Sequence, residues 1–108
     1  MKLLTRTEEF ILLAVWKLEE DAYSIPIREK LSEITDKDWS LGAIYMPLER
    51  LEKRGLLKSK LSESTPERGG RHKRIYEITG DGKAALQQIY NVQKTMWEGI
   101  AALMARRS

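Results

Sequence analysis

The chain has 108 residues, enough for one domain with a single modest core. Hydrophobic residues make up 42% and charged residues 32%, a composition typical of globular rather than disordered proteins. No stretch approaches 18 consecutive apolar residues, so no transmembrane helix is expected. The absence of cysteine excludes disulfides and thiolate chemistry, and we expect a cytoplasmic protein.

The net charge is only +3, but the charged residues are unevenly distributed. Residues 1–39 hold 6 Lys and Arg against 9 Asp and Glu, residues 40–79 hold 9 against 5, and residues 80–108 hold 4 against 2. A basic middle segment is typical of a surface that attracts nucleic acid. An asymmetry of this size also arises by chance, so it supports that interpretation only modestly.

A first helix is predicted over about residues 6–20. Thr5 and Glu8 have the spacing of a capping box, in which a hydroxyl and a carboxylate satisfy backbone donors at a helix start. Apolar residues occur on more than one face of this segment, which is too much for a helix packed on one side. The helix is therefore expected either to be central in the fold or to contact a second chain.

Two further helices follow. Ser24 is expected to cap the second, with Pro26 tolerated in its first turn, and "TDKD" at residues 35–38 to end it. Ser40 is expected to cap the third helix, which Gly55 ends in a left-handed conformation.

Pro47 falls inside the predicted third helix. A proline there removes one N–H and clashes with the carbonyl of Ala43, at a cost of about 3 kcal/mol. One interpretation is a bent helix, in which Pro47 sets the angle at which residues 40–45 approach a binding partner. The other is that the helix begins at Pro47 after a tight turn. We favour the bent helix.

A β-hairpin is predicted next, because residues 57–61 alternate in polarity and residues 74–78 are rich in β-formers. The intervening "SESTPERGGRHK" is too long for a two-residue turn and reads as an extended hairpin tip. Thr79 is expected to cap the last helix, with Asp81 in its first turn.

The last helix carries an apolar seam that extends beyond the hairpin and has no core to enter in a single chain. We therefore expect association of two copies through this helix and the first one. The predicted interface comprises Phe10, Leu12, Trp16, Leu86, Ile89, Tyr90, Gln93, Met96, Trp97, Ile100 and Leu103.

This order of elements matches a winged helix-turn-helix, a mainly helical (α+β) fold with a small β-hairpin. We predict a DNA-binding domain over residues 1–79, in which the third helix enters the major groove and the hairpin touches flanking backbone. A C-terminal dimerisation helix is predicted over residues 80–108.

Two motifs in these elements resemble the PadR family of transcriptional regulators, over roughly residues 5–90. The first is Ala43, Ile44, Tyr45, Pro47, Leu48, Leu51, Glu52 and Gly55; the second, after a basic tip, is Tyr76, Ile78, Thr79 and Gly82. The resemblance implies a homodimeric DNA-binding repressor whose dimer uses the C-terminal helix and the first helix. Ala22 and Ser24 depart from the glycines that members often show around a tyrosine, and the short C-terminal region implies a compact member.

The expected DNA contacts form two groups. The recognition-helix group is Lys37, Ser40, Gly42, Ala43, Tyr45 and Arg50, and the wing group is Arg68, Gly69, Gly70, Arg71, His72, Lys73 and Arg74. Small residues permit close approach to DNA, a tyrosine hydroxyl can bind phosphate, and a flexible basic loop suits the minor groove or nearby phosphates. The alternatives are tight packing of Gly42 and Ala43 on the second helix, a structural Tyr45 and a solvated charged loop.

Catalysis is not expected. His72 is the sole histidine, no cysteine is present, and no nucleophile or phosphate-loop motif occurs, so neither a metal site nor a cofactor is predicted. Trp16 and Trp97 are candidates to line a pocket for a planar hydrophobic effector, although core or interface packing is the more frequent use of tryptophan.

We therefore expect a cytoplasmic homodimeric repressor that binds double-stranded operator DNA, contacts no membrane, and is released by a small aromatic or hydrophobic effector. A winged-helix protein-interaction module that does not bind DNA is the alternative, and a small-molecule binder is a third. The basic tip and the Ser40–Tyr45 face favour DNA.

Overall fold

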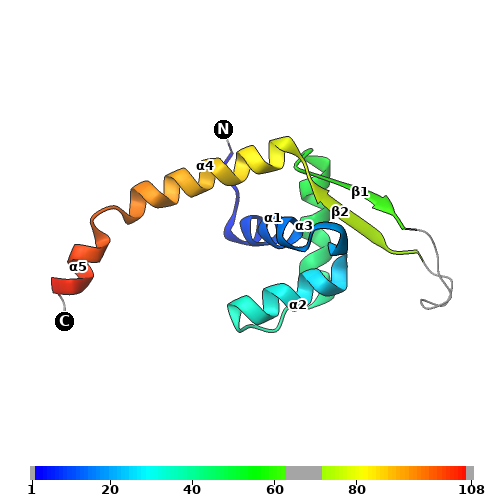
Figure 1. Cartoon of the computed structure of the whole chain (residues 1–108), viewed down its shortest axis with the longest axis horizontal. Coiled ribbons are helices and arrows are strands. Elements are labelled where there is room, and N and C mark those ends of the chain that lie inside the picture. Colours follow the sequence, from blue (N-terminus) through cyan, green and yellow to red (C-terminus); the bar gives the residue numbers. More distant parts are fainter. Residues whose placement is uncertain (1, 63–71, 107–108) are drawn as a thin grey trace.

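The computed structural model of the chain describes residues 2–62 and 72–106 (Figure 1). The elements in chain order are α1 (Arg6–Leu18), the 3-10 turn η1 (Glu19–Asp21), α2 (Ser24–Thr35), α3 (Leu41–Lys53), β1 (Leu57–Leu61), β2 (Arg74–Ile78), α4 (Gly80–Trp97) and α5 (Ile100–Arg106). The predicted fold class, mainly helical with one small antiparallel hairpin, is confirmed. In these described ranges no helix is long and apolar enough to cross a membrane.

α1 lies at the centre of the fold. It packs against α2, α3, α4 and β2, and its fully buried Ile11 and Leu12 meet a core to which α3 contributes Ile44, Leu48 and Leu51. Removal of these apolar side chains from water is the main stabilising contribution to such a core. The central position of α1 explains its buried apolar residues, while Leu13 and Trp16 remain exposed.

The capping box at the start of α1 is confirmed. Thr5 Oγ1 accepts from the Glu8 amide at 3.1 Å, and Glu8 Oε1 accepts from the Thr5 amide at 2.8 Å. The α-helix ends at Leu18, two residues earlier than predicted, and continues as η1. Three consecutive acidic residues in η1 explain the early end, since negative charge is unfavourable at the C-terminus of a helix.

The predicted cap of α2 is wrong. Tyr23 occupies the N-cap position, where its carbonyl accepts from the Ile27 amide at 3.1 Å, and Ser24 is the first helical residue. The Ser24 hydroxyl instead accepts from the Tyr45 hydroxyl at 3.5 Å. At the other end, Asp36 adopts a left-handed conformation (φ 54°) and ends the helix inside the predicted turn.

α3 runs without interruption through Pro47, so the alternative in which the helix begins at Pro47 is wrong. Ser40 is its N-cap, as predicted, and accepts from the Ala43 amide at 3.1 Å. Pro47 has no N–H to donate to the carbonyl of Ala43. Ala43 is an exposed residue in the first turn, where water can donate the missing hydrogen bond. Gly55 follows α3 with φ 77°, again as predicted.

The hairpin joins the helical body near the beginning of α4. β1 and β2 pair antiparallel from Leu57↔Ile78 to Leu61↔Arg74. Thr79 caps α4 by accepting from the Gly82 amide at 3.0 Å, and its hydroxyl donates to the Gly55 carbonyl at 2.7 Å. The end of α3, the hairpin and the start of α4 therefore meet at one point.

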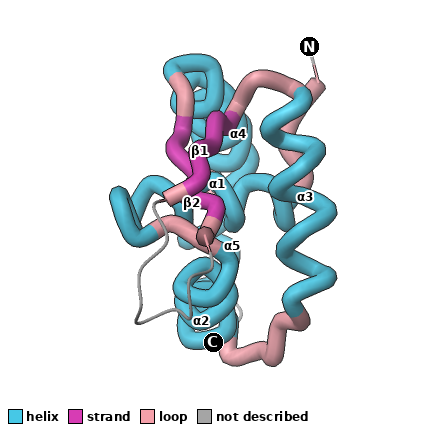
Figure 2. The backbone as a smooth tube through the Cα atoms, turned by 90° about the vertical axis from the view of Figure 1, so that its right-hand side faces the viewer, coloured by secondary structure: helices cyan, strands magenta, loops and turns pink. Residues whose placement is uncertain are grey.

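The last helix is not continuous, contrary to prediction. α4 ends at Trp97, and Gly99 has φ 81°, a left-handed conformation that glycine adopts without strain, before α5 begins at Ile100. We call residues 90–106 the arm. The arm extends from one end of the molecule while the hairpin extends from the other (Figure 1), and α3 stands upright beside the helical body in the perpendicular view (Figure 2).

Candidate nucleic-acid interface

α3 presents a mixed polar face to solvent. Its opposite face, formed by Ile44, Pro47, Leu48 and Leu51, is buried in the core. Since residues three or four apart share one side of a helix, the buried set leaves the remaining positions pointing outward. The exposed residues are Leu41, Gly42, Ala43, Tyr45, Met46, Glu49, Arg50 and Lys53.

All six residues predicted for the recognition-helix group are exposed: Lys37, Ser40, Gly42, Ala43, Tyr45 and Arg50. The hydroxyl of Ser40 already accepts the capping hydrogen bond, but its proton and its second lone pair remain available for another partner. Lys37 precedes the helix, with its ammonium 5.4 Å from the centre of the Trp39 ring. The small residues Gly42 and Ala43 face solvent rather than α2, which disfavours tight packing as their role.

Tyr45 links the exposed face of α3 to α2. Half of its surface is exposed, and its hydroxyl donates to Ser24 at 3.5 Å, at the limit of a hydrogen bond. A contact of this length leaves the phenol available for a stronger acceptor such as a phosphate oxygen.

Two predicted wing cations, Lys73 and Arg74, lie at the end of the strand pair that is farther from α4. Lys73 places its ammonium 3.9 Å from the centre of the Tyr23 ring, and Arg74 donates to the Ser59 hydroxyl at 2.9 Å. His72 Nδ1 lies 2.6 Å from the carbonyl oxygen of Ser62. The other predicted wing residues, Arg68, Gly69, Gly70 and Arg71, lie outside the described residues.

Ser59 also fixes the hairpin to α3. Its hydroxyl donates to Glu52 Oε2 at 2.7 Å while it accepts from Arg74. The chain of contacts from Arg74 through Ser59 to Glu52 therefore connects the hairpin to the exposed helix.

Five residues of this surface were missed from the sequence. Leu41, Met46, Glu49 and Lys53 are exposed on α3, and Ser24 reaches the same surface from α2. Met46, Glu49 and Lys53 were detectable, because none of them falls on the buried stripe of the helical repeat. Ser24 was not, since its contact with Tyr45 joins positions 21 residues apart.

A buried ion pair supports the end of α3. Arg54, the C-cap of α3, donates to Glu8 Oε2 at 3.2 Å. Burial raises the pKa of Glu8, but hydrogen bonds from Thr5 and the positive charge and hydrogen bond of Arg54 outweigh it, so the pKa lies below its usual value. The carboxylate is therefore kept ionised where α1 meets α3.

The predicted interface residues divide by their burial in the single chain. Leu12, Leu86 and Ile89 are buried in the core and are unavailable to a partner, which corrects their assignment to the interface. Their burial follows from the central position of α1, against which α4 packs. Phe10, Gln93 and Ile100 are partly exposed, while Trp16, Tyr90, Met96, Trp97 and Leu103 are exposed.

Trp16 lies in an open groove of about 640 Å³ between the end of α1, the hairpin and the start of α4. Lys58 and Lys60 line it from β1, and the Lys83 ammonium lies 5.1 Å from the centre of the Trp16 ring. Trp97 lies on the arm and does not line this groove, so the structure does not bring the two predicted effector residues into one pocket within a single chain.

Acidic, histidine and cysteine side chains do not gather into a candidate metal site anywhere in residues 2–62 and 72–106.

Comparisons with known proteins agree with this arrangement. The family described as "Transcriptional regulator PadR-like family" matches residues 12–88. A PadR-like transcription factor from Bacteroides fragilis superposes with a TM-score of 0.74 and 29% identity, over 89% of this chain and 87% of that one. A PadR family regulator from Clostridium difficile gives 0.63 and 27%, over 94% and 97%. A transcriptional regulator from Clostridium thermocellum, 24% identical over 89% and 87%, shares the fold with a TM-score of 0.70. Comparison with curated proteins returned no significant match.

Proposed function

This chain belongs to the PadR-like family of transcriptional regulators, and from that premise we propose that it binds double-stranded operator DNA as a homodimer and acts as a repressor. Its family consists of transcription regulators rather than enzymes. We expect it to work in the cytoplasm, where bound dimers would repress by blocking polymerase.

The observation that carries the proposal is the exposed face of α3 connected to the hairpin through Ser59. A recognition helix reads base edges in the major groove, while cations beside it neutralise phosphates. Arg50 and Lys53 supply charge on α3, and Arg74 supplies it on the hairpin.

The arm supports the homodimer. Its exposed apolar residues include Met96 and Trp97, with 72% and 60% of their surfaces exposed, and Tyr90 and Leu103 add to them. Contiguous exposed apolar surface of this kind marks an interaction site. A second copy offers the same surface, and two-fold symmetry would place two α3 helices about one turn of DNA apart.

The proposal is tested by DNA binding at several salt concentrations, with the duplex upstream of the chain's own gene as the first probe. The Arg50→Gln/Arg74→Gln variant should bind more weakly, and the slope of log affinity against log salt should fall by about 1–2, roughly one per lost phosphate contact. Lys94→Gln removes a charge from the arm, away from the proposed DNA contacts, and should leave the slope unchanged. Absence of binding to any duplex at low salt would favour the protein-interaction module.

We propose that a small aromatic or hydrophobic effector binds in the groove at Trp16. The volume of this groove is that of a small-molecule site, and it combines an exposed indole with lysines. Aromatic compounds that release the protein from DNA should quench tryptophan fluorescence. The quenching should be lost in Trp16→Phe and kept in Trp97→Phe; the reverse result would place the effector on the arm.

A further inference from the structure

Two neighbouring carboxylates, Glu8 and Glu9, are almost fully buried in the first turn of α1, with 4% and 8% of their surfaces exposed. Acidic side chains are rarely buried to this degree unless they are paired. The capping box accounts for Glu8, and the helix dipole favours negative charge at this end. Neither explains why a second carboxylate is buried beside the first.

Glu8 connects α1 to the end of α3. One carboxylate oxygen accepts from the Thr5 amide at 2.8 Å, and the other accepts from Arg54 at 3.2 Å. Because both oxygens are satisfied, the first turn of α1 and the last turn of α3 are held in a defined relation.

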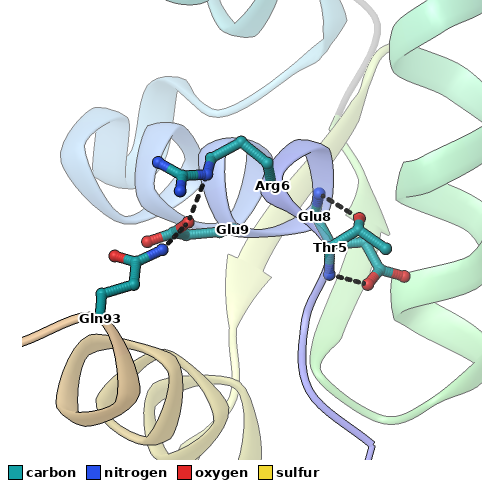
Figure 3. A network of polar contacts seen from close by, with 5 residues as sticks. All are labelled: Thr5, Arg6, Glu8, Glu9 and Gln93. Atoms are coloured by element: carbon teal, nitrogen blue, oxygen red, sulfur yellow. Dashed lines mark hydrogen bonds and ion pairs between the residues drawn. The ribbon is translucent and has the colours of Figure 1, made fainter. Parts of the chain in front are cut away.

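Glu9 connects the same turn to α4 (Figure 3). Gln93 donates from Nε2 to Glu9 Oε1 at 3.1 Å, and Arg6 Nε lies 3.6 Å from that oxygen. Gln93 follows the buried Leu86 and Ile89 at helical spacing on the face of α4 that packs on α1. From residue 94 to 106, all residues except the partly exposed Ile100 are exposed. The hydrogen bond therefore lies in the first turn of the arm, one helical turn beyond Ile89, the last buried residue of α4.

We propose that Glu9 and Gln93 form a positioning joint that fixes the direction of the arm relative to α3, and thereby the distance between the two α3 helices of the dimer. This inference rests on the homodimer proposed above. Within one subunit, α3 is connected to the first turn of α1 by the contact between Arg54 and Glu8. The same turn is connected to the arm by the hydrogen bond between Glu9 and Gln93, and the arm contacts the partner. A change at the joint redirects the arm and changes the spacing of DNA half-sites that the dimer can occupy.

A purely stabilising role is the simpler alternative. A hydrogen bond between partly buried polar groups contributes to folding stability whether or not it sets the direction of a helix. The two roles differ in what a substitution changes: stability alone, or the distance between the α3 helices.

The absence of cysteine makes this distance directly measurable. Glu49→Cys, on the exposed face of α3, carries a nitroxide label, and double electron–electron resonance on the full chain reports one distance between the labels of a dimer. Gln93→Glu in this labelled parent places two carboxylates against each other. Their repulsion should shift or broaden the distance distribution.

The exchanged variant Glu9→Gln/Gln93→Glu restores one amide and one carboxylate with their positions reversed, and it should restore the parent distribution. Gln87→Glu is the matched control, since Gln87 is exposed on α4 and hydrogen bonds to Asn91 in the same helix. It should leave the distance unchanged. If Gln93→Glu does not fold, Gln93→Met, which lacks the donor, should broaden the distribution.

Three results would overturn the joint: an unchanged distance in every folded Gln93 variant, an equal change in Gln87→Glu, or no recovery in the exchanged variant. Thermal unfolding followed by circular dichroism shows whether stability alone has changed. If the labelled parent gives no intermolecular distance, the protein is not a homodimer, and the proposed joint fails with it. This outcome differs from the three above, in which the parent does give a distance.

Discussion

Glu8 shows how one residue serves two structural purposes. Its backbone and side chain complete the capping box with Thr5, which any isolated helix could use, while its second oxygen binds Arg54, 46 positions away in the chain. Only the first purpose is encoded locally. The ion pair depends on the fold that brings the end of α3 to the start of α1.

Because of Glu8, the free energy of unfolding should decrease as the pH falls. A pKa below the usual value means that the folded state binds this proton less tightly than the unfolded state, so the contribution is present above the unfolded pKa and is lost as pH falls through the folded pKa. Glu8→Gln should cost about 1–3 kcal/mol near neutral pH and flatten the acid side of the stability curve. Urea unfolding from neutral to acid pH measures this, with Glu33→Gln on the exposed surface of α2 as the control for loss of one carboxylate. Parallel curves for Glu8→Gln and the parent would contradict it.

At the level of elements, the start of α4 is fixed by how closely it approaches the turn after α3. A Cβ at Gly82 would collide with the carbonyl oxygen of Leu56 and lie 2.7 Å from Ile78 Cγ1. The glycine in the motif Tyr76, Ile78, Thr79 and Gly82 is thus explained by backbone proximity, because a side chain would separate α4 from the hairpin.

Gly82→Ala should destabilise the protein by about 1–3 kcal/mol or more, the range for overpacking a well-packed site, since the colliding carbonyl belongs to the backbone and moves little. Gly80→Ala is the matched control, because nothing lies within 4 Å of the added Cβ. Chemical denaturation of both variants measures the difference. Equal stability of the two variants would mean that α4 and the turn after α3 can move apart at little cost in free energy.

Pro47 affects the conformation of α3 as an element. Pro47→Ala supplies an N–H to the carbonyl of Ala43 and removes the constraint on the first turn. If Pro47 sets the angle at which residues 40–45 meet DNA, the variant should keep its helix content by circular dichroism and lose DNA affinity. Unchanged affinity would show that the proline has no part in orienting the recognition surface.

The whole molecule is elongated, with principal extents of 59 × 31 × 21 Å, and its two projections leave the body at opposite ends (Figure 1). The hairpin is tied to α3, whereas the arm carries large apolar residues that the chain itself does not cover. This separation lets one end contact DNA while the other contacts a second copy.

Trp97→Lys should weaken the dimer without unfolding the chain, because the side chain is exposed in a single copy but apolar enough to be central in an interface. We expect the dissociation constant to rise by tenfold or more, about 1.4 kcal/mol. Sedimentation velocity measures it, with Thr95→Lys as a control that adds the same charge to the same turn of the arm. A parent that sediments as a monomer would contradict the homodimer.

The local parts of the fold could be predicted from the sequence. The capping residues Thr5, Ser40 and Thr79, the left-handed Gly55 after α3 and the two strands were all predicted correctly, since each depends on neighbours a few positions away. Two local predictions are wrong. Ser24 is not the cap of α2, because the helix begins one residue earlier with Tyr23 at its N-cap, and residues 80–108 are not one helix, because Gly99 adopts a left-handed conformation.

The candidate site shows the same division. The sequence predicted Tyr45 and Arg50 as surface contacts of the third helix, and both are exposed opposite the buried Ile44, Leu48 and Leu51. Only the tertiary structure decided that Leu12, Leu86 and Ile89 belong to the core, that Trp16 faces the hairpin, and that Glu9 meets Gln93 across 84 positions. Such contacts depend on where distant segments pack in space, which the periodicity of any single segment does not contain.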